Sequence, residues 1–234
     1  MQFSTLWYLQ RLNLFEAFTR AELVRVVRAV DMEELEKRDR VFQIGEAAGN
    51  VYFLIEGLVK IYRRGPSGRR ITLAIMHPGE VFGDHALTPG ESHEHGAEAL
   101  EPTIVGVMTA EAFRALLNQK PDLALRVVQR LGRQKRALER KIANLVFKDV
   151  PARLADTLLE LSEAYGQPCT HGLVRELAIS QQDLADLIGA TRQVVNSTLK
   201  QFQQQGLIAL RRQRVCFADA AGLGRIADAR EPLS

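Results

Sequence analysis

Short hydrophobic runs separated by turn residues fill the chain between Arg38 and Met108. The runs are VFQIG, VYFLIEG, LVKIYRR, RITLAIMHPGEVFG and TIVGVM. Glycine and proline stand between them, and RRGPSGRR joins two alternating runs through the kind of turn that closes a hairpin. Closely spaced strands of this kind predict an antiparallel β-barrel or β-roll. An amphipathic helix is expected ahead of it, over Ala21–Val30.

The hydrophobic pattern changes period after Pro121. Apolar residues then recur at alternating steps of three and four residues, which is the spacing of a coiled-coil seam. One long helix with such a seam predicts a parallel dimer with its own copy, although a helix packed on its own domain stays an alternative. The residues expected in the dimer interface are Val128, Leu131, Lys135, Leu138, Ile142 and Leu145, of which Lys135 alone is polar.

A new unit begins at Asp149-Val150-Pro151, because proline suits the first turn of a helix and disfavours helix in the residue before it. A helix is expected over Ala152–Tyr165, followed by a loop from Gly166 to Gly172.

Two further helices in this unit are marked by their end signals. Ser180 and Asp183 form an N-terminal cap pattern, Gly189 permits a tight turn, and Thr191 can cap a second helix. We expect the second helix to bury an apolar face made of Val194, Val195, Leu199 and Phe202. The order of these signals predicts a helix-turn-helix. The following LIALRRQRVCF predicts two short strands around a basic tip, as in the wing of a winged helix.

Composition limits the class of protein. The chain has 234 residues, of which 46% are hydrophobic and 25% are charged. These values are typical of globular proteins with room for two cores. No apolar run approaches the length of a membrane span. Cys169 and Cys216 show no paired metal-ligand spacing, which favours a reducing cytoplasmic location and no metal site at the cysteines.

Charge is placed unevenly along the chain. The formal net charge is only +3, yet eight basic residues lie between Arg126 and Lys148 against the single acid Glu139. This asymmetry favours a polyanionic partner. No nucleophile–base pair, phosphate-binding loop or zinc-protease motif accompanies it, so we expect no enzyme activity.

These features together resemble the CRP/FNR family of bacterial transcription regulators. The resemblance rests on Gly45, Gly57, Gly79 and Gly83, on NLVFKDVPARLADTLLEL, and on QQDLADLIGATRQVVNSTLKQFQQQGLI, and it covers nearly the whole chain. It implies an α+β homodimer that binds a palindromic operator in duplex DNA. The expected domains are a sensor β-roll with flanking helices over 1–120, a dimerisation helix over 121–148, and a winged helix-turn-helix over 149–234.

The second helix of the motif is expected to enter the major groove. Arg192 can reach guanine O6 and N7 with two hydrogen bonds, which makes it the leading base reader. Gln193 and Ser197 replace a glutamate and an arginine of the best-known family members, so the operator should differ from theirs. The full expected DNA-binding set is Gln181, Thr191, Arg192, Gln193, Asn196, Ser197, Lys200, Arg211, Arg212 and Arg214.

The sensor pocket departs from the family pattern. The resemblance places Gly83 and Asp84 at a ribose-binding pair, and it places His93 and Glu94 where the family has arginine and serine for the phosphate. Leu138 and Glu139 replace a threonine–serine pair that contacts adenine. A carboxylate repels a phosphate and a neutral histidine cannot replace arginine. We therefore expect no dependence on cyclic AMP, and the expected pocket is a degenerate one formed by Gly83, Asp84, His85, His93, Glu94, Leu138 and Glu139.

Several alternatives stay open at this point. Asp84, His85, His93, Glu94 and His95 are metal-type ligands, so metal or haem sensing competes with an unidentified ligand and with ligand-free operation. No residue is assigned as a metal ligand. The alternative function is a sensing module whose basic half contacts protein or RNA. The resemblance also implies RNA polymerase as a partner, through the basic hairpin with Arg63, Arg64, Arg69 and Arg70.

Overall fold

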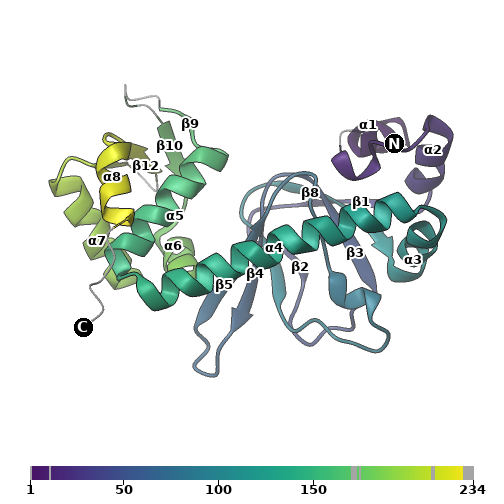
Figure 1. Ribbon diagram of the computed structural model, residues 1–234, viewed down its shortest axis with the longest axis horizontal. Coiled ribbons are helices and arrows are strands. Elements are labelled where there is room, and N and C mark those ends of the chain that lie inside the picture. The colour runs from purple at the N-terminus through teal and green to yellow at the C-terminus, as the bar shows by residue number, and fades with distance from the viewer. Residues whose placement is uncertain (1, 11, 170–172, 174, 212–213, 229–234) are drawn as a thin grey trace. The chain divides into compact units, whose positions relative to one another are not determined.

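The computed structural model describes residues 2–10, 12–169, 173, 175–211 and 214–228 (Figure 1). The chain divides into two compact units, 1–136 and 137–234, which are described separately below. Among the described residues, no helix combines the length and the apolar character that crossing a membrane requires.

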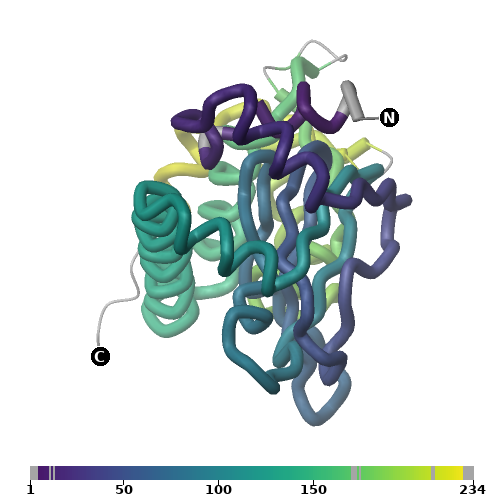
Figure 2. The backbone as a smooth tube through the Cα atoms, turned by 90° about the vertical axis from the view of Figure 1, so that its right-hand side faces the viewer, coloured from purple at the N-terminus to yellow at the C-terminus, as the bar shows by residue number. Residues whose placement is uncertain are grey.

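Two antiparallel sheets form the roll of the first unit, and their strands run side by side in Figure 2. The first has the order β1-β8-β3-β6, with β1 at Asp31–Leu35, β8 at Thr103–Thr109, β3 at Asn50–Glu56 and β6 at Val81–Phe82. The second has the order β2-β7-β4-β5, with β2 at Arg40–Phe42, β7 at Gly96–Ala99, β4 at Val59–Arg64 and β5 at Arg70–Met76. The predicted β-roll, including the β4–β5 hairpin, is confirmed.

Helices pack on one side of the roll. They are α1 (Gln2–Gln10), η1 (Asn13–Phe15), α2 (Arg20–Val27) and α3 (Ala110–Gln119), and a short η2 (Asp84–Leu87) follows β6. Phe53 of β3 lies between Phe15 and Phe113, with ring centroids 5.5 and 5.8 Å away, and all three are fully buried. The predicted N-terminal helix is present as α2, which ends at Val27, three residues earlier than expected.

A buried ionic network joins three strands of the second sheet. Glu98 of β7 accepts Lys60 Nζ on one oxygen and Arg70 Nη1 on the other, each at 2.9 Å. The side chains of Lys60 and Glu98 are only 7% and 10% exposed. The Arg70 guanidinium also lies over the Tyr62 ring, 4.6 Å from its centroid. Removing Glu98 would leave the Lys60 ammonium buried without its carboxylate, and such an unpaired buried charge destabilises the fold.

The long helix is α4, Pro121–Phe147 (Figure 1). Most predicted seam residues are exposed: Val128 by 63%, Leu131 by 40%, Leu138 by 39% and Ile142 by 54%, and Lys135 is exposed as well. Leu145 differs, because it is half-buried and its Cδ2 lies 3.1 Å from the place a Cβ on Gly189 would occupy. Leu145 thus contacts its own unit.

Helix α5 (Val150–Tyr165) is capped by Asp149, whose side chain accepts the Ala152 N–H. Pro151 lies in the first turn, as predicted. Asp156 of α5 accepts Asn144 Nδ2 at 2.7 Å and Lys148 Nζ at 3.0 Å. Arg153 donates to the carbonyl oxygens of Leu145 and Lys148. The last turns of α4 are therefore fastened to α5.

The rest of the second unit is a small sheet with three helices. The sheet has the order β11-β12-β10-β9, with β11 at Ile208–Arg211, β12 at Arg214–Phe217, β10 at Arg175–Ala178 and β9 at Gln167–Pro168. The helices are α6 (Gln181–Ile188), α7 (Arg192–Gln204) and α8 (Ala220–Ala227), and α8 packs on α5. Strands β9 and β10 had no counterpart in the sequence prediction, which had a loop over Gly166–Gly172.

Candidate DNA-binding surface and sensor pocket

The two helices of the predicted motif begin and end where their local signals stand. Ser180 caps α6 by accepting the Asp183 N–H at 3.0 Å, and Thr191 caps α7 by accepting the Val194 N–H at 3.3 Å. Gly189 ends α6 with φ of 65°, a left-handed conformation that other residues adopt at a cost. The helix-turn-helix prediction is confirmed at each of these positions.

Helix α7 presents one polar face. Arg192, Gln193, Ser197 and Lys200 are exposed and Asn196 is half-buried, whereas Val195, Thr198, Leu199 and Phe202 are buried. The helix contains no acidic residue, so nothing on it repels a phosphate backbone.

Hydrogen bonds tie two of these side chains to neighbours. Gln181 Nε2 in the first turn of α6 donates to Asn196 Oδ1 in the second turn of α7 at 3.3 Å, which orients both amides. The Ser197 hydroxyl donates to the Val194 carbonyl at 2.9 Å. Because Ser197 is engaged with its own helix backbone, its capacity to read a base edge is reduced.

Val194 was expected in the core and lies outside it. Its side chain is 40% exposed, because it stands one turn from Ser197 on the polar side of α7. The spacing of apolar residues in the sequence did not predict that Val194 is exposed. An exposed valine on this face offers an apolar surface of the kind that contacts the methyl group of thymine.

The wing consists of β11 and β12, paired so that Arg211 faces Arg214 across the ladder. Arg211 is exposed. Arg214 forms an ion pair with the buried Glu176 of β10, so its guanidinium already has a carboxylate partner. The predicted contact residue Arg212 lies outside the described residues.

Gly83 fixes the backbone at the start of the predicted sensor pocket. It adopts φ of 85°, and a Cβ there would lie 2.8 Å from both the Asn50 carbonyl oxygen and Tyr52 Cδ2. Only glycine suits this position, which turns the chain from β6 into η2. Asp84 follows as an exposed residue.

Three histidines gather beside this turn. His93 is 2% exposed and stacks on Phe42 with centroids 3.8 Å apart, and its Nδ1 has no hydrogen-bond partner among the described atoms. The His85 and His95 rings lie 4.8 Å apart, and His85 Nδ1 lies 3.2 Å from Glu91 Oε2. Burial lowers the pKa of His93 and of His95, and the neighbouring histidines lower them further. Both rings are therefore neutral near pH 7.

Glu94, next to His93 in the sequence, forms an ion pair outside the histidine cluster. It is exposed and pairs with Arg63 at 3.3 Å. Leu138 and Glu139 are exposed on α4 and belong to the second unit, so their part in the pocket stays a prediction.

The hairpin tip is less free than its sequence indicated. Arg63 is paired with Glu94, and Arg70 is held by Glu98 and Tyr62. Arg64 and Arg69 are exposed. A contact of these four arginines with RNA polymerase stays a prediction.

Comparisons with known proteins agree with this architecture. Residues 32–120 match the cyclic nucleotide-binding domain family, and residues 152–226 match the Crp-like helix-turn-helix domain family. A CRP-like cAMP-activated global transcriptional regulator of Mycobacterium tuberculosis is 30% identical over 218 residues, covering 93% of this chain and 97% of that protein. The chain belongs to the CRP/FNR family of transcription regulators.

Solved structures of CRP/FNR proteins share the fold. A CRP-family transcriptional regulator of Thermus thermophilus is 28% identical with a TM-score of 0.76, covering 86% of this chain and 100% of that one. The c-di-GMP responsive global regulator CLP of Xanthomonas campestris is 25% identical with a TM-score of 0.76, covering 85% and 99%. The chain is thus a CRP/FNR-type transcription regulator with a DNA-binding helix-turn-helix, and the family consists of regulators rather than enzymes.

A further cluster in this CRP/FNR protein escaped the sequence analysis. Cys169, Glu176 and Cys216 meet on the sheet of the second unit. Burial raises the pKa of the Cys216 thiol, and the adjacent Cys169 raises it further. The cysteines lie far apart in the sequence, so no spacing rule could have paired them.

Proposed function

We propose that the protein is a homodimer whose two α7 helices read a two-fold symmetric operator, and that it does so without cyclic AMP. The observation that carries the proposal is the exposed polar face of α7, which has two basic residues, Arg192 in the first turn and Lys200 beyond the middle of the helix, and no acid.

Base reading is assigned to the N-terminal part of α7. Arg192 is exposed in the first turn, where a recognition helix approaches base edges. A bidentate contact to guanine contributes about 1–3 kcal/mol of discrimination. Gln193 and Asn196 follow on the same face and can pair with adenine, and Val194 can contact a thymine methyl group.

Phosphate contacts are assigned to the edges of this surface. Arg211 on the wing and Lys200 in the second half of α7 are exposed cations. Such contacts set affinity and register and carry no sequence information. Gln181 and Thr191 lie at the helix starts, where backbone N–H groups also suit phosphate oxygens.

Dimerisation is assigned to α4. Val128, Leu131, Leu138 and Ile142 leave large apolar surfaces exposed at seam spacing. A lone helix gains nothing from such exposure, whereas pairing with a second copy would remove this surface from water.

The matched pair Arg192→Ala and Arg211→Ala tests the division between readers and phosphate contacts. Arg192→Ala should cost about 1–3 kcal/mol per half-site and relax the preference at one guanine. Arg211→Ala should weaken all sequences alike and reduce the slope of log affinity against log salt by about 0.9 per half-site. Binding sites selected from random duplexes, followed by salt titration, provide the measurement. Identical specificity profiles for the two variants would contradict the assignment.

Independence from cyclic AMP follows from the neutral pocket. His93 is buried and uncharged, and Glu94 is turned to Arg63, so neither offers a cation to a phosphate. Losing two charge-assisted contacts lowers affinity by about two to four powers of ten. The relatives named above are described as responding to cAMP and to c-di-GMP, so the signal differs within this fold.

Metal-stripped protein should therefore bind its operator equally well with and without cyclic AMP. Calorimetry of the free protein and operator titration measure the two steps separately. Micromolar cyclic AMP binding with a matching gain in operator affinity would contradict this expectation and show that the phosphate cradle lies elsewhere in the roll.

A further inference from the structure

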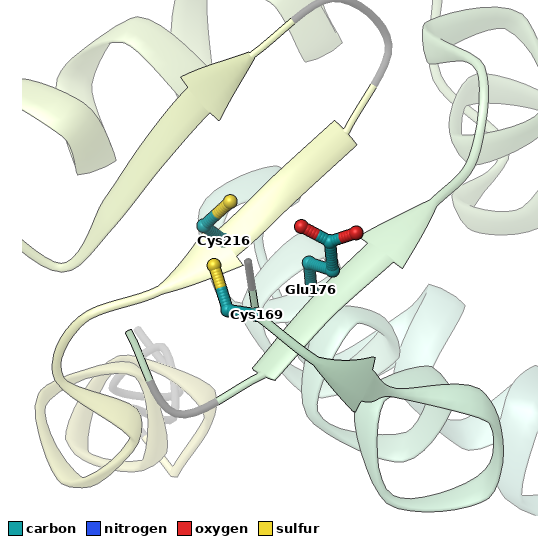
Figure 3. Close-up of side chains that lie close together, drawn as sticks. All are labelled: Cys169, Glu176 and Cys216. Carbon is teal, nitrogen blue, oxygen red and sulfur yellow. The ribbon is translucent and has the colours of Figure 1, made fainter. Parts of the chain in front are cut away.

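Two thiols and a carboxylate converge on one face of the small sheet in the second unit. The ligand atoms of Cys169, Glu176 and Cys216 all lie within 4.8 Å of one another. Figure 3 shows the three side chains pointing toward a common space, with Glu176 on β10 and Cys216 on β12. The histidines beside η2, by contrast, form no such convergent group among the described residues.

Strand register holds two of the three groups together. Glu176 and Cys216 are direct partners in the antiparallel β10–β12 ladder, and Glu176 is also opposite Gln167 of β9. Directly opposite residues put their side chains on the same face of a sheet. Cys169 follows directly after β9, and Figure 3 shows its side chain beside that of Cys216. The sheet therefore fixes Glu176 and Cys216, and the end of β9 brings Cys169 to them.

Burial gives the cluster one accessible side. Cys216 is fully buried and Glu176 is 3% exposed, whereas Cys169 is half-buried. A buried carboxylate is costly without a cationic partner. Glu176 has one in Arg214, whose own side chain is 51% exposed and lies at the start of β12.

We propose that Cys169, Glu176 and Cys216 bind one thiophilic divalent cation of the zinc type. Two thiolates and one carboxylate are a donor set that Zn²⁺ accepts, with a fourth position for water. The Zn–S and Zn–O lengths of a tetrahedral site put neighbouring ligand atoms roughly 3.5–3.8 Å apart. Side chains already within 4.8 Å reach that spacing by small rotations.

A disulfide explains the cluster less well. It requires the sulfurs to approach to about 2.05 Å and gives Glu176 no role. A metal uses all three groups as ligands, including the buried carboxylate of Glu176. Spontaneous oxidation of the reduced thiols without metal binding is the competing result in the experiment below.

Metal binding changes the partner of Glu176. The ion takes one carboxylate oxygen and neutralises much of the negative charge of Glu176, which weakens the ion pair with Arg214 and makes the guanidinium more available to an anion at the wing. If the wing contacts phosphates, as the proposed function has it, the loaded protein gains a cation there. This second step alone rests on the proposed function, and the binding site itself does not.

The site is tested first with Co²⁺ as a zinc probe on the reduced, full-length protein without DNA. The chain has only two cysteines, so any thiolate-to-cobalt charge-transfer absorption must come from this pair. One Co²⁺ per chain with tetrahedral visible bands is expected, and Zn²⁺ should displace it. Absence of the charge-transfer band, or oxidation of the thiols with no metal bound, overturns the proposal.

Four variants locate the ligands and test the competing ion pair. Cys169→Ser and Cys216→Ser should each leave about half or less of the charge-transfer intensity, and the half-buried Cys169 keeps the test valid if Cys216→Ser unfolds. Glu176→Gln should weaken Co²⁺ binding by about tenfold or more. Arg214→Gln should strengthen it, because the competing guanidinium is gone. Equal Co²⁺ affinities in Glu176→Gln, Arg214→Gln and the unchanged protein would overturn the role of the carboxylate.

The coupling to the wing has its own readout. Zn²⁺ should steepen the salt dependence of duplex binding by about 0.9 in log–log slope per arginine that gains a phosphate, in the unchanged protein but not in Cys169→Ser. Equal slopes with and without Zn²⁺, in a protein that demonstrably binds it, would refute the coupling. Loss of duplex binding altogether would instead refute the proposed function.

Discussion

Replacing Leu131 and Leu138 by glutamate should yield a monomer that has lost most of its affinity for a two-fold symmetric operator. Both leucines are about two-fifths exposed on α4 in the single chain. Fully burying an exposed leucine contributes about 1.5–3 kcal/mol, and the dimer would bury the part of four leucines that is still exposed. Glutamates at the same positions would face each other across the seam as like charges.

The monomer should lose DNA affinity because it cannot bind both half-sites of the operator at once. Two recognition helices on one dimer engage two half-sites with an avidity that exceeds either half-site by about 10²–10⁴-fold. Sedimentation gives the oligomeric state, and titration of a palindromic duplex gives the affinity. The matched control is Arg133→Glu with Arg140→Glu, which places the same side chains at exposed positions off the seam and should stay dimeric. An intact dimer in the leucine double variant would refute the seam.

Glu98→Ala should lower the free energy of unfolding of the roll by about 3–5 kcal/mol, because it removes the carboxylate that Lys60 and Arg70 share. Replacing the pair together, as Lys60→Met with Glu98→Leu, should cost less, because the buried Lys60 is removed with its carboxylate and the partner lost is that of Arg70, which is 29% exposed. The single tryptophan, Trp7, lies in the first unit and reports its unfolding in urea.

The control for this series is Glu101→Ala, which removes an exposed carboxylate from the turn after β7 and should stay within about 0.5 kcal/mol. If Glu98→Ala costs no more than Glu101→Ala, the network does not stabilise the roll.

The helix-turn-helix was predictable because its signals are local. Ser180, Gly189 and Thr191 act on backbone groups a few residues away, so neither their caps nor the turn depends on distant parts of the chain. The β-roll was predictable as a class for a similar reason, since alternation and turn residues are read within single strands. The order of strands in its sheets was not, because pairing depends on contacts between distant segments.

The functional details that sequence reasoning missed are all non-local. The Glu176–Cys216 pair exists because β10 and β12 meet in one register, and the Glu176–Arg214 ion pair follows from the same pairing. Val194 was misplaced because the helical period alone does not say how wide the buried stripe is. One buried ion pair had a signal in the sequence. Lys60 and Glu98 each interrupt a hydrophobic strand, and such lone charges in apolar runs can be expected to pair with each other.

The hydrogen bonds between α4 and α5 limit where sensor and DNA-binding domains can be recombined in evolution. Asp156 holds Asn144 and Lys148, and Arg153 holds the last carbonyls of α4, so a recombination point at the short link near Asp149 would separate groups that depend on each other. A viable exchange of sensors would have to join within α4 itself. It would also have to preserve the phase of that helix, since an insertion of one or two residues would turn Leu138 and Ile142 away from the line set by Val128 and Leu131. A new combination of sensor and DNA-binding domain should therefore need a continuous line of seam residues along α4 before the ligand of its sensor can matter.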